Sequence, residues 1–177
     1  MKKLQNITLV TFGGVDKAIL NQIAKAVQTE LDLNVHVLEK YFDITVFYDP
    51  TRRQYNANHL LHLLKTNIEI PENIIVGVFK VDLFIPILTY IFGQAMLNGN
   101  YAVASYYRLQ NERYGLEKNS ELMLLRLKKE VIHELGHTFG LIHCHNAGCV
   151  MLSSTYVEDI DQKNALFCKA CKAKLNE

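Results

Sequence analysis

The sequence predicts a mixed α/β fold in one domain, on the basis of three observations. Strand-like and helix-like spacings of apolar residues alternate along the first part of the chain. An Asn98-Gly99 dipeptide lies between two segments rich in β-branched and aromatic residues, which favours an antiparallel hairpin. A length of 177 residues is enough for one sizeable hydrophobic core. We therefore expect a single domain in which a mixed sheet packs against helices.

The first predicted element is a strand over residues 7–12, which is a short apolar run. Apolar residues then recur at helical spacing over residues 15–31, and Asp16 near the start of this segment favours a helix. Two short runs with β-branched residues, 34–38 and 44–48, predict the second and third strands. The α/β prediction rests on this alternation.

Leucines at helical spacing predict a helix over residues 58–65, and an apolar run after a break at a proline predicts a strand over residues 74–81. The Asn98-Gly99 dipeptide then predicts a type I′ turn that joins strands over residues 91–97 and 101–108. This hairpin is either an ordinary surface feature or one whose unpaired edge binds an extended peptide.

The strongest chemical signal is His133-Glu134-x-x-His137, which lies within a predicted helix over residues 120–139. Two histidines four positions apart lie on one face of a helix, so both imidazoles can reach one cation. Imidazole nitrogen suits zinc, and a site with three protein ligands keeps its fourth position open for water. Glu134 is placed to act as the general base for that water.

Gly140 and His143 extend this motif. Glycine tolerates positive φ, so Gly140 can end the helix and let the chain turn back to deliver His143 as a third ligand. A lone His-Glu-x-x-His also occurs by chance on amphipathic helices. The longer pattern with Gly140, His143 and Met151 is that of the metzincins. By its residue type alone, Met151 is only an adaptable packing residue.

Four cysteines follow the helix as two short pairs, Cys144-x4-Cys149 and Cys168-x2-Cys171. This spacing is typical of tetrahedral four-cysteine zinc sites. Two disulfides or four buried thiols are the alternatives, and disulfides need an oxidising compartment. His143 precedes Cys144 directly, and neighbouring side chains of an extended segment point to opposite sides. One strip of backbone could therefore hold a catalytic metal on one side and a structural metal on the other.

Four lysines also lie near the second cysteine pair in the sequence. They either offset the negative charge of a four-thiolate zinc site or belong to an ordinary solvated tail. They are Lys163, Lys169, Lys172 and Lys174.

The pattern from His133 to Cys171 resembles the archaemetzincins, metzincin-clan zinc metallopeptidases with a second zinc on four cysteines. The resemblance in motifs covers residues 133–171. It implies Glu134 as general base and Met151 as the Met-turn, an apolar floor below the catalytic zinc. The tyrosine that follows this Met by two positions in some metzincins is Ser153 here. The implied ligands are His133, His137 and His143 for a catalytic zinc, and Cys144, Cys149, Cys168 and Cys171 for a structural zinc.

The resemblance also implies a metzincin-like fold. It comprises a twisted mixed β-sheet with an antiparallel edge strand, an active-site helix beneath it, and a small C-terminal four-cysteine zinc subdomain. Residues 91–97 are our candidate for the edge strand, along which a peptide substrate would lie extended. Within one metallopeptidase domain over residues 1–177, we expect an N-terminal subdomain over 1–140 and a C-terminal subdomain over 141–177.

Composition restricts the partners and the location. A net charge of +1 without a basic stripe argues against nucleic-acid binding. The most apolar run, residues 83–92, is too short to span a membrane. Residues 1–3 resemble the start of a signal peptide, but polar residues interrupt the segment that follows. We therefore expect a cytoplasmic monomer that acts on peptides or proteins.

The sequence thus predicts a zinc-dependent metallopeptidase with two Zn²⁺, one catalytic and one structural, in which a metal-activated water cleaves the peptide bond. The alternative is a zinc-stabilised peptide-binding protein with little or no proteolytic activity. A nucleic-acid adaptor built on the four-cysteine site is a third possibility, which the near-neutral charge disfavours.

Overall fold

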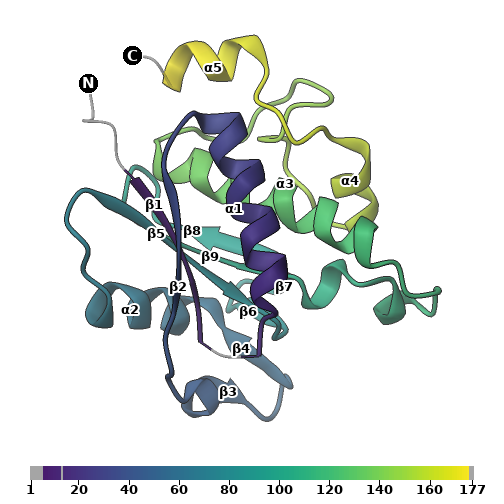
Figure 1. The fold of residues 1–177 in the computed structure, drawn as a ribbon. Coiled ribbons are helices and arrows are strands. Elements are labelled where there is room, and N and C mark those ends of the chain that lie inside the picture. The colour runs from purple at the N-terminus through teal and green to yellow at the C-terminus, as the bar shows by residue number, and fades with distance from the viewer. Residues whose placement is uncertain (1–5, 13, 176–177) are drawn as a thin grey trace.

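A five-stranded mixed sheet forms the centre of the computed structural model, which describes residues 6–12 and 14–175 (Figure 1). Residues 1–3, considered above for a signal peptide, lie outside that range. In spatial order, the strands are β2 (Val35–Glu39), β1 (Asn6–Thr11), β5 (Asn73–Phe79), β9 (Tyr101–Ser105) and β8 (Gly93–Ala95). The first four are parallel, and β8 is antiparallel at the edge. The predicted mixed α/β fold with an antiparallel edge strand is confirmed.

Helices cover both faces of this sheet, with α1 and α3 on one face and α2 on the other (Figure 1). The long helices are α1 (Lys17–Leu31), α2 (Ala57–Asn67) and α3 (Ser120–Thr138). The side chains of Asp16 and Asn119 accept hydrogen bonds from backbone N–H groups in the first turns of α1 and α3, which places the starts of these helices. Every residue of β5 is buried, because helices pack on both sides of it.

A smaller four-stranded sheet lies beside the first. Its spatial order is β3 (Tyr48–Asp49), β4 (Gln54–Asn56), β6 (Leu83–Ile85) and β7 (Leu88–Ile91). The prediction of a strand over residues 44–48 is wrong, because Ile44–Phe47 forms a 3₁₀ helix. The Asp43 carboxylate accepts a 3.0 Å hydrogen bond from the Thr45 backbone N–H, which starts that turn.

The predicted hairpin joins β8 to β9, but its turn is not of type I′. A type I′ turn needs positive φ at both central residues, and only Asn98, at φ 53°, has it here. The Gly99 N–H instead donates to the Met96 carbonyl at 2.9 Å, and the Asn98 N–H donates to the carbonyl of His137 at 2.9 Å. The turn is thereby tied to the end of α3.

The candidate edge strand is also shorter than expected. Residues 91–97 do not form one strand, because β7 ends at Ile91 in the small sheet and β8 begins at Gly93 in the large one. Phe92, which is buried, lies where the chain passes between the sheets. The part of this segment that pairs at the edge is therefore β8 alone.

The chain after α3 wraps back over the face that carries α1 and α3. It contains two short helices, α4 (Val157–Gln162) and α5 (Lys169–Leu175), which the sequence did not indicate. Buried side chains from this segment, including Met151 and Ile160, join the hydrophobic cluster beneath α1 and α3. Among the described residues, no helix combines the length and apolar character needed to cross a membrane.

Candidate metal centres and active site

The end of α3 brings a third histidine back toward the helix. Gly140 has φ 93°, a left-handed conformation that glycine adopts at low cost, and its N–H donates to the His137 carbonyl. The returning chain is held by a 2.9 Å hydrogen bond from the Cys144 N–H to the Met151 carbonyl. His143 is thereby placed opposite the helix, as we predicted from the glycine at position 140.

The structure brings His133, His137 and His143 together. Each offers a ring nitrogen, and these three atoms all lie within 4.8 Å of one another. His133 is buried, His137 is partly buried and His143 is exposed, so the group is accessible from one side. This arrangement provides three ligand atoms and leaves one side of the site open.

The hydrogen bonds of two of these rings show which nitrogen atoms are available. Nδ1 of His133 lies 2.8 Å from the Val150 carbonyl oxygen, and Nδ1 of His137 lies 2.7 Å from that of Leu141. A carbonyl oxygen only accepts, so each Nδ1 carries a proton and donates it. The two Nε2 atoms, 3.1 Å apart, then direct lone pairs at each other. A cation between them removes this conflict, so the donor set fits a metal ion.

Desolvation favours the neutral form of the three imidazoles, most strongly at the buried His133. Desolvation lowers the pKa of His133 well below its usual value, and it also lowers the pKa values of His137 and His143. Neutral imidazole is the form that binds a metal. The lowered pKa values therefore favour metal binding, as the positions of the ring nitrogens do.

Glu134 lies beside this group in a very restricted space. Burial first, and then the nearby Glu130 carboxylate, raise the pKa of Glu134 well above its usual value. A Cβ added to Gly93 in β8 would lie 2.7 Å from the Glu134 Oε1 atom and 2.8 Å from the Val103 carbonyl oxygen. Only glycine at position 93 lets the edge strand pass this close to the carboxylate.

Met151 lies fully buried under α3. Its Sδ atom occupies the space where a Cβ on Gly136 would be, so the helix can accept Met151 only because position 136 lacks a side chain. Both Gly93 and Gly136 were missed as functional residues in the sequence. An isolated glycine within a predicted strand does signal a close approach of backbone or ligand, and Gly93 could have been found in that way.

The four cysteines form a second cluster, in which all four Sγ atoms lie within 4.8 Å of one another and none is in a disulfide. Sγ of Cys144 lies 3.9 Å from Sγ of Cys168, and Sγ of Cys149 lies 3.8 Å from Sγ of Cys171. Two sulfurs at about 2.3 Å from one tetrahedral zinc lie ~3.8 Å apart. The cluster therefore has the dimensions of a four-thiolate zinc site, as its spacing predicted.

Burial raises the pKa of Cys149 and of Cys171, whereas backbone hydrogen bonds act in the opposite direction at some of these sulfurs. The Cys168 N–H donates to Sγ of Cys149 at 3.4 Å, and the Asn146 N–H donates to Sγ of Cys144 at 3.3 Å. The Cys171 backbone N–H is the main cause that lowers the pKa of Cys168 to about 7. A thiolate is the form of cysteine that binds a metal.

Lys163 has a role that neither sequence interpretation anticipated. It is 2% exposed, pairs with Glu130 Oε1 at 3.3 Å and donates to the Leu152 carbonyl at 3.1 Å. It therefore belongs neither to a solvated tail nor to the cysteine cluster, but lies near the histidine site, where, after desolvation, its charge contributes to the lowered pKa of His133. The other three lysines, Lys169, Lys172 and Lys174, are exposed on α5.

Removing this ammonium group is expected to be costly. The Lys163→Met variant leaves the Glu130 carboxylate buried without its partner, which should reduce the free energy of unfolding by about 3–5 kcal/mol. Urea denaturation measures this. The Lys163→Met/Glu130→Leu double variant removes both charges and should recover most of the loss. An equal loss in the single and double variants would show that the ion pair is not the cause.

A groove of about 760 Å³ runs past the histidines and Glu134. One side, which we name the strand rim, consists of residues 88–95 in β7, Phe92 and β8. The opposite side, the loop rim, consists of residues 142–143 and 153–156. Helix α3 contributes its side chains between the two rims, so a ligand in the groove meets Glu134 and the three imidazoles.

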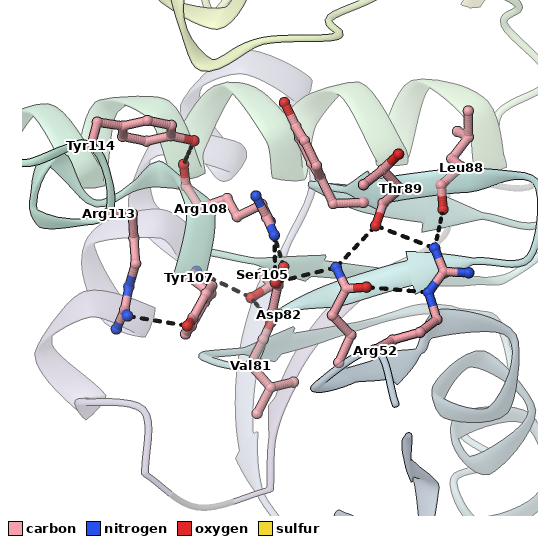
Figure 2. Close-up of polar contacts among 12 residues, drawn as sticks. Arg52, Val81, Asp82, Leu88, Thr89, Ser105, Tyr107, Arg108, Arg113 and Tyr114 are labelled. Atoms are coloured by element: carbon pink, nitrogen blue, oxygen red, sulfur yellow. Dashed lines mark hydrogen bonds and ion pairs between the residues drawn. The ribbon is translucent and has the colours of Figure 1, made fainter. Parts of the chain in front are cut away.

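A polar network supports the strand rim from behind (Figure 2). The Arg108 guanidinium makes two 2.6 Å hydrogen bonds to the Asp82 carboxylate. Arg52 donates to the Leu88 carbonyl at 2.7 Å, and the Gln54 amide donates to the Thr89 carbonyl at 3.0 Å. The Arg108–Asp82 pair is bidentate, and Arg52 and Gln54 bind the backbone of β7 directly, so the strand rim is a supported surface.

Sequence comparison places this chain among peptidases. A model of peptidase family M54 matches residues 7–177. An archaemetzincin from Methanocaldococcus jannaschii is 36% identical over 178 residues, which cover 100% of this chain and 96% of that protein. An archaemetzincin from Sulfolobus acidocaldarius is 37% identical over 175 residues, which cover 98% of this chain and 97% of that protein.

Solved structures of similar proteins indicate the same family. The crystal structure of archaemetzincin from Methanopyrus kandleri matches with a TM-score of 0.84 and 34% identity, over 97% of this chain and 93% of that one. A zinc-dependent peptidase from Methanocorpusculum labreanum matches with a TM-score of 0.84 and 27% identity, over 97% of this chain and 100% of that one. The resemblance drawn from the motifs is confirmed, and so are the fold class and the enzyme class. The chain therefore belongs to the archaemetzincins, peptidase family M54, and is a zinc-dependent metallopeptidase.

Proposed function

We propose that this chain hydrolyses peptide bonds with a catalytic zinc on His133, His137 and His143 and with Glu134 as general base. One observation carries the proposal, namely the two Nε2 atoms 3.1 Å apart whose rings both donate from Nδ1 to backbone carbonyls. A zinc ion bound there would polarise the scissile carbonyl and lower the pKa of the attacking water toward about 7. The accessible side formed by His143 is where substrate and water would enter.

Glu134 transfers the proton in this proposal. Its carboxylate accepts a proton from the attacking water and then gives it to the nitrogen of the leaving amine. A general base works best when its pKa is near the working pH, and burial and Glu130 move the pKa of Glu134 upward in that direction. The close approach of Gly93 limits the positions available to the carboxylate.

The substrate binds along β8. An edge strand has backbone donors and acceptors that no other strand uses, and an extended peptide can pair with them with little demand on its sequence. β8 is such an edge, and it passes directly over Glu134. Pairing at β8 therefore places a peptide bond next to the general base.

A second, structural zinc would be held by the four cysteines and would stabilise the segment that presents His143. Cys144 directly follows His143, and its N–H binds the Met151 carbonyl. Cys149 lies in the same returning segment. Cys168 directly precedes α5, and Cys171 lies in the first turn of that helix. A metal that joins these four thiolates would stabilise the returning chain.

A mixed peptide library tests the function. With zinc present, we expect cleavage products, their loss on treatment with a chelator, and their return when zinc is added back, all measured by mass spectrometry. The alternative of a zinc-stabilised peptide-binding protein predicts peptides retained by the protein and no metal-dependent products. That second result, with two zinc ions bound, would overturn the proposed hydrolysis.

A further inference from the structure

Tyr90 of β7 connects the two rims of the groove. Its hydroxyl donates a 2.9 Å hydrogen bond to the Thr155 carbonyl oxygen, and both residues line the groove. Within residues 6–12 and 14–175, no other hydrogen bond joins the strand rim to the loop rim. We name this contact the Tyr90–Thr155 bridge. It crosses the groove three positions before Gly93 along the strand rim.

Two neighbouring side chains, those of Arg108 and Phe92, hold the Tyr90 ring in place. The Arg108 guanidinium lies 4.1 Å from the ring centroid, and the Phe92 ring packs edge to face at 5.7 Å. Arg108 is itself held by Asp82, as Figure 2 shows. A cation held over an aromatic face stabilises the ring there. The bridge is therefore supported by the same network as the strand rim.

The position of the bridge limits the space beside the catalytic centre. Gly93 lies over Glu134, and Tyr90 comes three positions earlier in the strand rim. At about 3.3 Å per residue in extended chain, the backbone of Tyr90 is at most ~10 Å from that point. Away from the bridge, the groove is lined by exposed apolar side chains, those of Leu97 (58% exposed) and Ile142 (65% exposed). Among the described residues, no hydrogen bond connects these two residues across the groove. About three extended residues fit on the bridged side.

The direction of β8 indicates which end of the substrate meets the bridge. β8 runs from Gly93, nearest the bridge, toward Ala95, away from it. Antiparallel pairing is slightly more stable per residue than parallel pairing, so a peptide bound to β8 runs the other way. Its residues after the cleaved bond then point toward Tyr90.

We propose that Tyr90 is a specificity-determining residue, which limits the peptide to about three residues on the C-terminal side of the cleaved bond. This inference rests on the proposed function. The enzyme would then remove short pieces from the C-termini of chains, because a longer segment must first break the bridge and displace the ring.

Two peptide series with one common central sequence test this. One is extended by one to eight residues after the cleaved bond, and the other is extended before it. In the native protein, kcat/KM is expected to fall about tenfold once more than about three residues follow the bond, as one exposed hydrogen bond and one ring contact must break. The N-terminal series should show no such fall. Equal rates along the C-terminal series, or a fall in the N-terminal series instead, would overturn the proposal.

Three variants assign the limit to Tyr90. Tyr90→Ala removes the ring and should abolish the dependence on C-terminal length, and Tyr90→Phe keeps the ring and should reduce it. Tyr114→Phe is the matched control. The Tyr114 hydroxyl also donates to a backbone carbonyl, that of Arg108 at 2.7 Å, but Tyr114 does not line the groove. Its length dependence should equal that of the native protein.

Both Tyr90 variants keeping the native length dependence would refute the proposal. If Tyr90→Ala melts far below the native protein, the length dependence of Tyr90→Phe alone is used to test the role of Tyr90. Should the native protein cleave neither series, the proposed function fails and this inference fails with it. Cleavage of short and long peptides at equal rates refutes only the role of Tyr90.

Discussion

The Glu134→Gln variant is expected to lose about 10²- to 10⁴-fold in kcat, which is the usual contribution of a general base. Glutamine has nearly the shape of glutamate, so it should fit the narrow space below Gly93. Its amide cannot accept the proton of the attacking water. The three imidazoles are unchanged, and the zinc content should therefore remain that of the native protein.

Steady-state kinetics and zinc measured by mass spectrometry check this result. Glu121→Gln is the matched control, because Glu121 lies in the first turn of the same helix and is exposed. It should keep native kcat. The general-base assignment would be refuted by a Glu134→Gln variant that turns over at the native rate with full zinc content.

Loss of one cysteine should reduce both the zinc content and the stability of the protein. The Cys168→Ser variant is expected to bind one zinc in place of two, because a hydroxyl is a poor replacement for a thiolate. Structural zinc contributes folding energy. A loss of about 3 kcal/mol lowers Tm by roughly 6–12 °C in a chain of this size.

Native mass spectrometry gives the zinc count, and calorimetry gives Tm. Lys169→Ser is the control, since it changes the neighbouring exposed residue without touching the cluster. Peptide hydrolysis should also fall in Cys168→Ser, because the segment that presents His143 loses its support. Two zinc ions and an unchanged Tm in this variant would mean that the four cysteines hold no structural metal.

Local spacing accounts for the part of the candidate site that was predicted. His133, Glu134 and His137 lie close together on one helix. Gly140, three residues before His143, allows the chain to reverse its direction. Such relations depend on helix geometry and on glycine's freedom, and both can be inferred from neighbouring residues. The structure therefore places these side chains as the pattern indicated.

Two errors in the fold prediction also have local causes. Residues 44–48 are a short apolar run, which periodicity alone does not assign to strand or helix. The Asp43 side chain selects a 3₁₀ turn there. In the hairpin, the bond from the Asn98 N–H to the His137 carbonyl selects a different turn from the one that Asn-Gly favours in isolation. A contact from a distant helix overrode the local preference.

The sequence by itself determined the family, the enzyme class and the candidate ligands of two metal sites, because each of these depends on residues a few positions apart. Only the tertiary structure decided what surrounds them. Gly93 comes to lie over Glu134, Lys163 is buried against Glu130, and Tyr90 reaches across the groove. These contacts join residues tens of positions apart, and long-range packing, which no local spacing encodes, brings them together.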